Sequence, residues 1–271
     1  MRPFAFILLF LSVQIFIPIK IVAQVNSGAR FTAMANAGTA MEDVFSLGSN
    51  QAGITSLKYS KIAFEYREHF YSSNTRSLAA LAVLPTKAGN LGLYADRYSF
   101  EKTLEEVRVG LTYARFFGPK LSLATTINYH RLFISESFAE KTLSFDLGFQ
   151  YHLTEHWLWG IHLVNPVGLF INEAAAYQLP IKFRLGTSYM MSSQVLLAME
   201  SEYDWGQHYD FRLGLEYSIL NWLKLRGGTS VNPFQYFAGA GLVFQRIQLD
   251  VASSFHPLLG ISPQLSVSYG F

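Results

Sequence analysis

Apolar and polar residues alternate along most of the chain from residue 58 onward. In the stretch that begins at Thr103, one face of an extended chain carries Val107, Val109, Leu111 and Tyr113, and the other carries Arg108, Gly110, Thr112 and Ala114. The same alternation recurs in LSFDLGFQYHL from Leu143 and in DFRLGLEYSI from Asp210. A repeat of two residues indicates a β-strand with one apolar face. The pattern therefore predicts an all-β protein.

We count about fourteen such segments, each near the roughly 9 to 11 residues that a tilted strand needs to cross a bilayer. Tight connections, such as 117–120 and 192–194, alternate with longer polar ones, such as 68–77 and 256–263. A soluble sandwich would also alternate, but aromatic residues near both sets of connections are typical of membrane interfaces. We predict a transmembrane, antiparallel, up-and-down β-barrel over residues 58–271, with both of its ends in the periplasm.

The first 24 residues predict a secretory signal peptide. Arg2 provides the basic start, an apolar run follows, and the small residue Ala23 stands just before Gln24. Pro18 and Lys20 argue against a permanent membrane helix. No later apolar run reaches the roughly 18 residues of a membrane-spanning helix. We therefore expect an exported protein that strands hold in the outer membrane of a Gram-negative bacterium.

Composition agrees with a membrane barrel and excludes several partners. The chain is 50% hydrophobic and 15% aromatic, and only 15% of it is charged, against about 25% in typical soluble domains. The net charge of +2 is small and the basic residues are scattered, which argues against nucleic-acid binding. Because the chain has no Cys, disulfides, thiolate metal sites and a cysteine-linked lipid anchor are excluded.

The sequence ends in LSVSYGF, a strand pattern with no polar tail. An open edge in hydrocarbon would leave a row of backbone groups without partners, so the last strand must pair with the first. Alternation that ends in an aromatic residue resembles the signal by which the barrel-insertion machinery recognises its clients. We expect the residues of this signal to face the outer-membrane lipids: Leu265, Val267, Tyr269 and Phe271.

Residues 25–57 differ from the rest because they lack the two-residue repeat and are rich in Ala, Gly, Ser and Asn. Small residues suit close packing in a narrow space, so we expect a hatch folded into the barrel. A periplasmic extension is the alternative.

The run GARFTAMANAGTAMEDVFSLGSNQAGI resembles the N-terminal motif of FadL-type outer-membrane barrels and of their PorV and PorQ relatives. In that motif a Gly/Ala-rich run precedes an acidic residue and then Asn-Pro-Ala-Gly, but Gln51 stands at the proline position of this sequence. The resemblance implies a fourteen-stranded barrel with an N-terminal hatch, in agreement with the strand count. The matching residues are Gly38, Ala40, Asp43, Asn50, Ala52 and Gly53.

Charged residues within the strands are expected to face the lumen, since Lys or Arg at the lipid midplane costs about 2 to 4 kcal/mol. Arg184 is expected to pair with Glu200 or Glu202, and Glu216 with Lys224 or Arg226. Such a network either stiffens the barrel or forms a polar constriction for a solute. Its predicted members are Arg184, Glu200, Glu202, Arg212, Glu216 and Arg226.

We expect no enzymatic activity, no metal and no cofactor. The seven His residues form no spaced metal motif. His130 and His152 are expected to face inward, but the sequence ties no Ser nucleophile to either of them.

Two functions remain open from the sequence. In the first, which a compact barrel with a densely charged interior favours, the protein is an accessory subunit of a larger outer-membrane complex, resembling PorV and PorQ of type IX secretion. In the second, it passes hydrophobic small molecules, as the FadL resemblance implies. Fold alone does not decide between these functions.

Overall fold

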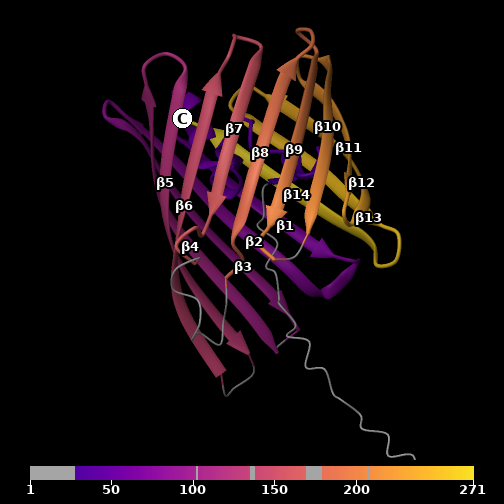
Figure 1. The fold of residues 1–271 in the computed structure, drawn as a ribbon. Coiled ribbons are helices and arrows are strands. Elements are labelled where there is room, and N and C mark those ends of the chain that lie inside the picture. Colours follow the sequence, from indigo (N-terminus) through magenta and orange to yellow (C-terminus); the bar gives the residue numbers. More distant parts are fainter. Residues whose placement is uncertain (1–27, 102, 135–137, 169–178, 207) are drawn as a thin grey trace, which may run out of the picture.

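The structure is a computed structural model that describes residues 28–101, 103–134, 138–168, 179–206 and 208–271. Its strands form one closed antiparallel barrel in which each strand pairs with its neighbours in sequence (Figure 1). The strands are β1 (Lys61–His69), β2 (Ser72–Thr86), β3 (Gly89–Phe100), β4 (Leu104–Phe117), β5 (Leu121–Ile134), β6 (Phe138–His152), β7 (Trp157–Val164), β8 (Lys182–Met190), β9 (Val195–Asp204), β10 (Tyr209–Leu220), β11 (Leu223–Val231), β12 (Phe234–Phe244), β13 (Ile247–His256) and β14 (Gly260–Gly270).

The pairing of β1 with β14 closes the barrel. It runs in register from Lys61 opposite Gly270 to Arg67 opposite Gln264. The predicted fourteen-stranded, closed, all-β barrel is thereby confirmed. Closure removes both sheet edges, which is the condition for a sheet to survive in hydrocarbon.

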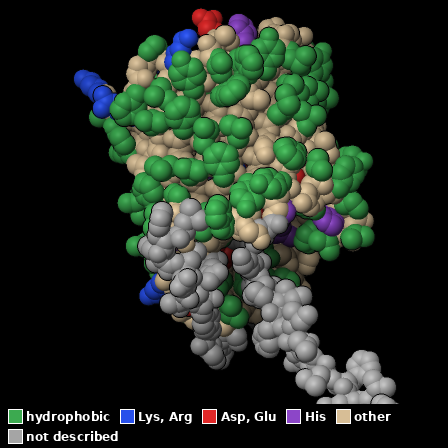
Figure 2. All heavy atoms as spheres, in the orientation of Figure 1, with side chains coloured by type: hydrophobic (Ala, Val, Ile, Leu, Met, Phe, Trp, Pro, Cys, Tyr) green, Lys and Arg blue, Asp and Glu red, His purple; other side chains and the backbone are tan. Residues whose placement is uncertain are grey.

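The two faces of the barrel wall differ in chemistry as the alternation predicts. Leu111 on the outer face is 65% exposed, whereas Ser266 and Ser268 on the inner face are buried. Figure 2 shows hydrophobic side chains over most of the visible wall, with Lys, Arg, Asp and Glu mainly near its two ends. This band suits contact with lipid.

The two ends of the barrel are distinguished by their connections. We call one end the turn end; it carries the six connections β2–β3, β4–β5, β6–β7, β8–β9, β10–β11 and β12–β13. Phe271 lies at this end, because Tyr269 pairs with Ile247 at the start of β13. The opposite end is the loop end. In Figure 1 the C-terminus and the turn end lie at the top.

Two predicted loops at the loop end are wrong. β1 and β2 leave only Phe70 and Tyr71 between them, instead of a loop over 68–77, and β14 begins at Gly260, inside the loop expected over 256–263. Five successive strands, β2 to β6, have 12 to 15 residues. The backbone ladder continues beyond the apolar band, where polar residues such as Ser72 and Arg76 pair across strands just as well.

The described residues 28–57, which we call the N-terminal segment, lie inside the barrel. They form α1 (Gly28–Ala33), η1 (Val44–Gly48) and η2 (Gln51–Ser56), and nearly all of their side chains are buried. α1 contacts β11 to β14, whereas η2 contacts β3 to β6. The predicted signal peptide, residues 1–24, lies outside the described residues. No helix in the described part of the chain is long and apolar enough to cross a membrane.

Candidate functional site in the barrel lumen

The predicted motif residues build the two short helices of the N-terminal segment. Asp43 is the N-cap of η1: its Oδ1 accepts from the Val44 backbone N–H at 2.6 Å, and its own backbone N–H donates to Ser46 Oγ at 3.1 Å. Asn50 is the N-cap of η2, and its Oδ1 accepts from the Ala52 backbone N–H at 3.2 Å. Such caps satisfy backbone donors that a short helix leaves unpaired.

Asn50 also attaches the segment to the wall. Its Nδ2 donates to the Thr39 carbonyl at 2.7 Å and to the Phe149 carbonyl of β6 at 3.0 Å. Ala40 is buried, and its carbonyl accepts from Ser188 Oγ of β8 at 2.6 Å. One side-chain amide thus joins the two halves of the segment to the barrel.

The motif glycines allow the segment to fold on itself. A Cβ at Gly38 would lie 2.7 Å from both the Phe31 ring and Ser49 Oγ, and a Cβ at Gly53 would overlap the Met41 carbonyl. Gln51, at the position of the family proline, is buried, and its Nε2 donates to the Leu47 carbonyl at 3.4 Å. The motif is therefore a packing device in this chain, and its functional role stays a prediction.

Glycines of the wall also admit the segment. Added Cβ atoms on their inner face would meet backbone or side-chain atoms of the segment at distances of 2.8 Å or less. Only glycine permits so close an approach between two backbones. These inward glycines are Gly92, Gly148, Gly160, Gly186, Gly214, Gly228 and Gly239.

An ion-pair network near the turn end joins the segment directly to two strands, β10 and β1. Arg30 donates to Glu216 of β10 through Nε at 2.9 Å and Nη2 at 3.2 Å, and to Asp43 through Nη1 at 3.0 Å. Asp43 also pairs with Lys61 of β1 at 3.1 Å. Burial would raise the pKa of Asp43, but Lys61 and Arg30 together lower the pKa below its usual range.

The wall continues this turn-end network. Glu216 accepts from Arg226 Nε at 2.6 Å and lies 3.4 Å from Lys224 Nζ, so both expected partners contact it. Arg226 also pairs with Asp250 of β13 at 2.7 Å. Asp43, Glu216, Arg226 and Asp250 are buried, whereas Arg30, Lys61 and Lys224 are partly buried. Buried charges persist when they are paired in this way.

A second network lies nearer the loop end. Arg184 pairs with Glu202 at 2.6 Å, and Arg212 pairs with Glu200 at 3.0 Å and with Glu202 at 3.1 Å. The second oxygen of Glu200 accepts from the Thr39 backbone N–H at 2.9 Å, which connects this network to the segment as well. The predicted lumen charges thus form two separate clusters on β8 to β11, and whether either one acts on a solute stays a prediction.

Part of the inner wall on β1 to β3 is apolar, which the sequence analysis missed, although Glu65 and Arg67 of β1 are buried on the same inner face. Ala63, Leu81, Val83 and Tyr94 point inward from β1 to β3 and are buried in one cluster with Phe45, Leu47 and Ile54 of the segment. The signal was present in LAALAVL, residues 78–84, which is apolar on both faces instead of one. An apolar inner face is unusual in a membrane barrel, whose interior is normally polar.

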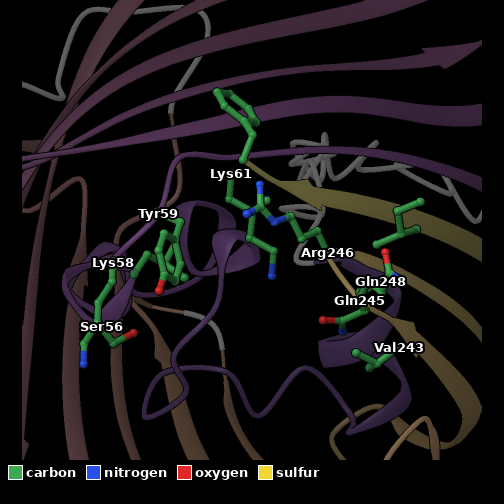
Figure 3. A pocket seen from close by; sticks show the side chains of 12 residues that line it. Ser56, Lys58, Tyr59, Lys61, Val243, Gln245, Arg246 and Gln248 are labelled. Carbon is green, nitrogen blue, oxygen red and sulfur yellow. The ribbon is translucent and has the colours of Figure 1, made fainter.

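Two hollows lie at opposite ends of the segment. The loop-end hollow has a volume of about 210 Å³ and is lined by Asn36 and Ser49 of the segment and by the charged residues Arg67, Arg184, Asp210 and Arg212. The turn-end hollow is larger, about 590 Å³, and borders Ser56 and Leu57 (Figure 3). The N-terminal segment therefore stands between two cavities.

One of the two histidines expected to face inward, His130, lies beside a serine. His130 Nε2 lies 2.9 Å from Ser144 Oγ, a Ser–His pair that the sequence did not reveal. Its Nδ1 has no hydrogen-bond partner among the described residues, so the acid that would orient a nucleophile–base pair is missing from that part of the chain. Within the described residues no group of His, Asp and Glu could hold a metal ion.

The predicted insertion-signal residues lie on or just after β14. Leu265, Val267, Tyr269 and Phe271 are all exposed on the outer face, and the Tyr269 and Phe271 rings stack with centroids 6.1 Å apart. Their role as a recognition signal stays a prediction.

Comparison with known proteins places this barrel within a structural class. No protein-family model matches the sequence, and no curated protein is significantly similar to it. Among solved structures, the barrel is similar to the CymD monoaromatic hydrocarbon channel, with a TM-score of 0.72, 13% identity, and coverage of 92% of this chain and 99% of that one. The chain therefore shares the fold of that channel.

Two further structures refine that class. The Pseudomonas putida toluene transporter TodX has a TM-score of 0.68 and 12% identity over 92% of this chain and 99% of its own. A Pseudomonas aeruginosa FadL homologue has a TM-score of 0.67 and 11% identity over 90% of this chain and 98% of its own. The fold is therefore FadL-like, as one side of the resemblance implied.

These comparisons correct the first of the two functions. The predicted accessory role, resembling PorV and PorQ in type IX secretion, is wrong, because the similar structures include monoaromatic hydrocarbon channels and a toluene transporter. The sequence analysis favoured that role because it considered the charged inward residues and not the apolar ones on β1 to β3. Similarity to channels is consistent with the expected lack of enzymatic activity.

Proposed function

We propose that this protein is an outer-membrane channel for small hydrophobic molecules and that its N-terminal segment is the hatch. The turn end then faces the periplasm together with both ends of the barrel, and the loop end faces outward. Outer-membrane lipids surround the wall, and the barrel-insertion machinery assembles it. The predicted larger complex stays a prediction.

The apolar inner wall carries this proposal. Leu81 and Val83 of β2 present an apolar surface to the N-terminal segment, and Tyr94 of β3 packs in the same cluster, although the Arg108 guanidinium also lies 4.4 Å from the centre of its ring. A channel for polar solutes has no use for such a surface, because burying a polar solute against it leaves hydrogen bonds unmade. A movement of η1 away from β1 to β3 would open an apolar path along one side of the lumen.

The segment is held in a way that suits a hatch. Its η1 packs against β1 to β3. Its polar groups are attached elsewhere: Arg30 and Thr39 bind Glu216 of β10 and Glu200 of β9, and Asn50 binds the backbone of β6. Polar contacts of this kind can be exchanged for water when the segment moves. Gating needs a fixed part and a part that moves. The closed barrel is the fixed part, and the segment, which is not part of the strand ladder, is the part that moves.

Uptake of labelled toluene tests the proposal, in cells whose own hydrocarbon channels have been deleted but whose outer membrane is intact. Expression of the protein should accelerate uptake. The double variant Leu81→Asn/Val83→Thr should reduce uptake several-fold by making the inner wall polar. The matched control is Ala80→Ser/Ala82→Ser, which adds hydroxyls to the outer face of the same strand. Uptake that the protein does not change would refute the channel function.

A further inference from the structure

The turn-end hollow lies where the barrel closes. It is bordered by the last residues of the N-terminal segment, the start of β1, the turn between β12 and β13, and Phe271 after β14. Figure 3 shows Lys61 and Arg246 on one side of the space, Ser56, Lys58 and Tyr59 on a second, and Val243, Gln245 and Gln248 on a third. Its volume of about 590 Å³ is within the range of about 300 to 1,000 Å³ that small-molecule sites occupy.

The charge of this hollow has one sign. Lys58, Lys61 and Arg246 line it, and its described lining includes no Asp or Glu. Lys61 is shared with Asp43, but Lys58 and Arg246 are exposed and take part in none of the ion pairs between described residues. Two cations are therefore free to bind an anion.

The rest of the lining is mainly apolar and spans the rim of the barrel. Lys61 and Gln248 belong to the inner face of the wall, whereas Ile247 and Phe271 are exposed on its outer face. A molecule in the hollow can thus contact the lumen mouth and the lipid side together. Cations beside apolar residues at a membrane interface match an anionic head group that carries a hydrocarbon chain.

We propose that the turn-end hollow binds the anionic head group of an amphiphile, with the head group between Lys58 and Arg246 and the hydrocarbon chain on Ile247 and Phe271. The head group is a phosphate or a carboxylate. It comes either from an anionic phospholipid of the membrane leaflet at the turn end or from an amphiphile that leaves the lumen. Binding at equilibrium requires no passage through the barrel, so this inference stands or falls independently of the channel function.

Native mass spectrometry of the full-length mature protein in detergent tests the proposal. The probes are phosphatidylglycerol, oleate and, as a lipid without net charge, phosphatidylethanolamine. The protein should bind phosphatidylglycerol or oleate more tightly than phosphatidylethanolamine. The variant Lys58→Gln/Arg246→Gln should weaken that binding by about fivefold for each cation removed. Weaker binding of phosphatidylglycerol alone identifies a membrane lipid, and weaker binding of oleate alone identifies a departing amphiphile.

The matched control is Lys87→Gln/Lys120→Gln, which removes the same charge from two other turns at the turn end, outside the hollow. Its affinities should stay within about twofold of the parent protein because long-range charge effects are screened. Heat-modifiable mobility on gels checks that each barrel is folded, and Arg246→Lys should retain binding. If the double variant does not fold, Arg246→Gln alone provides the comparison. Equal binding of the anionic probes by the parent protein and the hollow variant overturns the proposal, as does equal binding of phosphatidylethanolamine and both anionic probes.

Discussion

Arg30 binds Glu216 through two nitrogens, at 2.9 and 3.2 Å, and so connects the N-terminal segment directly to β10. Glu216 is buried, and only 13% of the Arg30 side chain is exposed. Removal of one partner of a buried ion pair leaves the other charge uncompensated and costs about 3 to 5 kcal/mol. This contact should therefore contribute strongly to holding the segment in the lumen.

We expect Arg30→Gln to loosen the segment by about 3 kcal/mol while the barrel stays folded. Chymotrypsin cleavage at Phe31 or Phe45 measures the loosening, because both residues are buried while the segment is seated. The control is Arg97→Gln, which breaks the exposed Arg97–Glu105 pair of β3 and β4 and should cost less than about 1 kcal/mol. Equal protease resistance of Arg30→Gln and the parent protein would contradict the anchoring role.

Neighbouring glycines on β11 provide a test of the close approach between wall and segment. A Cβ at Gly228 would lie 2.8 Å from the Ala35 nitrogen and the Leu213 carbonyl oxygen, whereas at Gly227 the nearest atom would be 3.8 Å away. Gly228→Ala should therefore destabilise the protein by about 1 to 3 kcal/mol, and Gly227→Ala by no more than about 0.5 kcal/mol. Urea unfolding in detergent compares the two variants. Equal urea midpoints for the two variants would show that the barrel wall or the segment shifts to accommodate the added methyl group.

Acid should release the segment through Asp43. Because Lys61 and Arg30 lower the pKa of Asp43, its ion pairs stabilise the seated segment fully above about pH 4, the ordinary Asp value. This contribution is lost as pH falls through the lowered pKa. Protease access to the segment should rise over that acid range in the parent protein. Asp43→Asn should show raised access at neutral pH and a weaker acid response; an unchanged acid response would exclude Asp43 as its source.

Deletion of residues 25–56 should open a conductance in planar bilayers. The segment separates the loop-end hollow from the turn-end hollow, so its removal joins the two spaces. The parent barrel in the same bilayer is the control and should pass little current. A deletion variant that is folded and equally tight would show that the segment does not close the lumen.

Phe271→Asp should lower the amount of inserted barrel in cells. Phe271 is exposed and stacks on Tyr269 at the turn end, and a carboxylate there disrupts both the apolar pattern and the aromatic belt. Heat-modifiable protein in outer-membrane fractions measures insertion. Ser268→Ala, on the inner face of the same strand, is the control. Normal insertion of Phe271→Asp would remove the support for a C-terminal signal.

The two-residue repeat was sufficient to predict the barrel, the strand number and the inward position of residues such as Arg226 and Glu216. It underestimated the lengths of β1, β2 and β14, because the paired strands continue beyond the apolar band. The partners of the N-terminal segment could not be predicted, since the segment has no repeat that gives its side chains a direction. Arg30 joins Glu216 across 186 residues, and only the folded barrel brings the two together. Similarly, the sequence does not show that Leu81 faces inward against apolar residues of the N-terminal segment, because that contact exists only in the folded barrel.

Closure between β1 and β14 also constrains the order of folding. Ile62 pairs with Tyr269, so the bond that seals the cylinder joins residues 207 positions apart (269 − 62), while every other strand pair is local in the sequence. Contacts over so large a separation form slowly, because the entropy of closing the loop is lost before the contact is gained. The thirteen local pairings can form one after another, but the cylinder seals only when β14 meets β1.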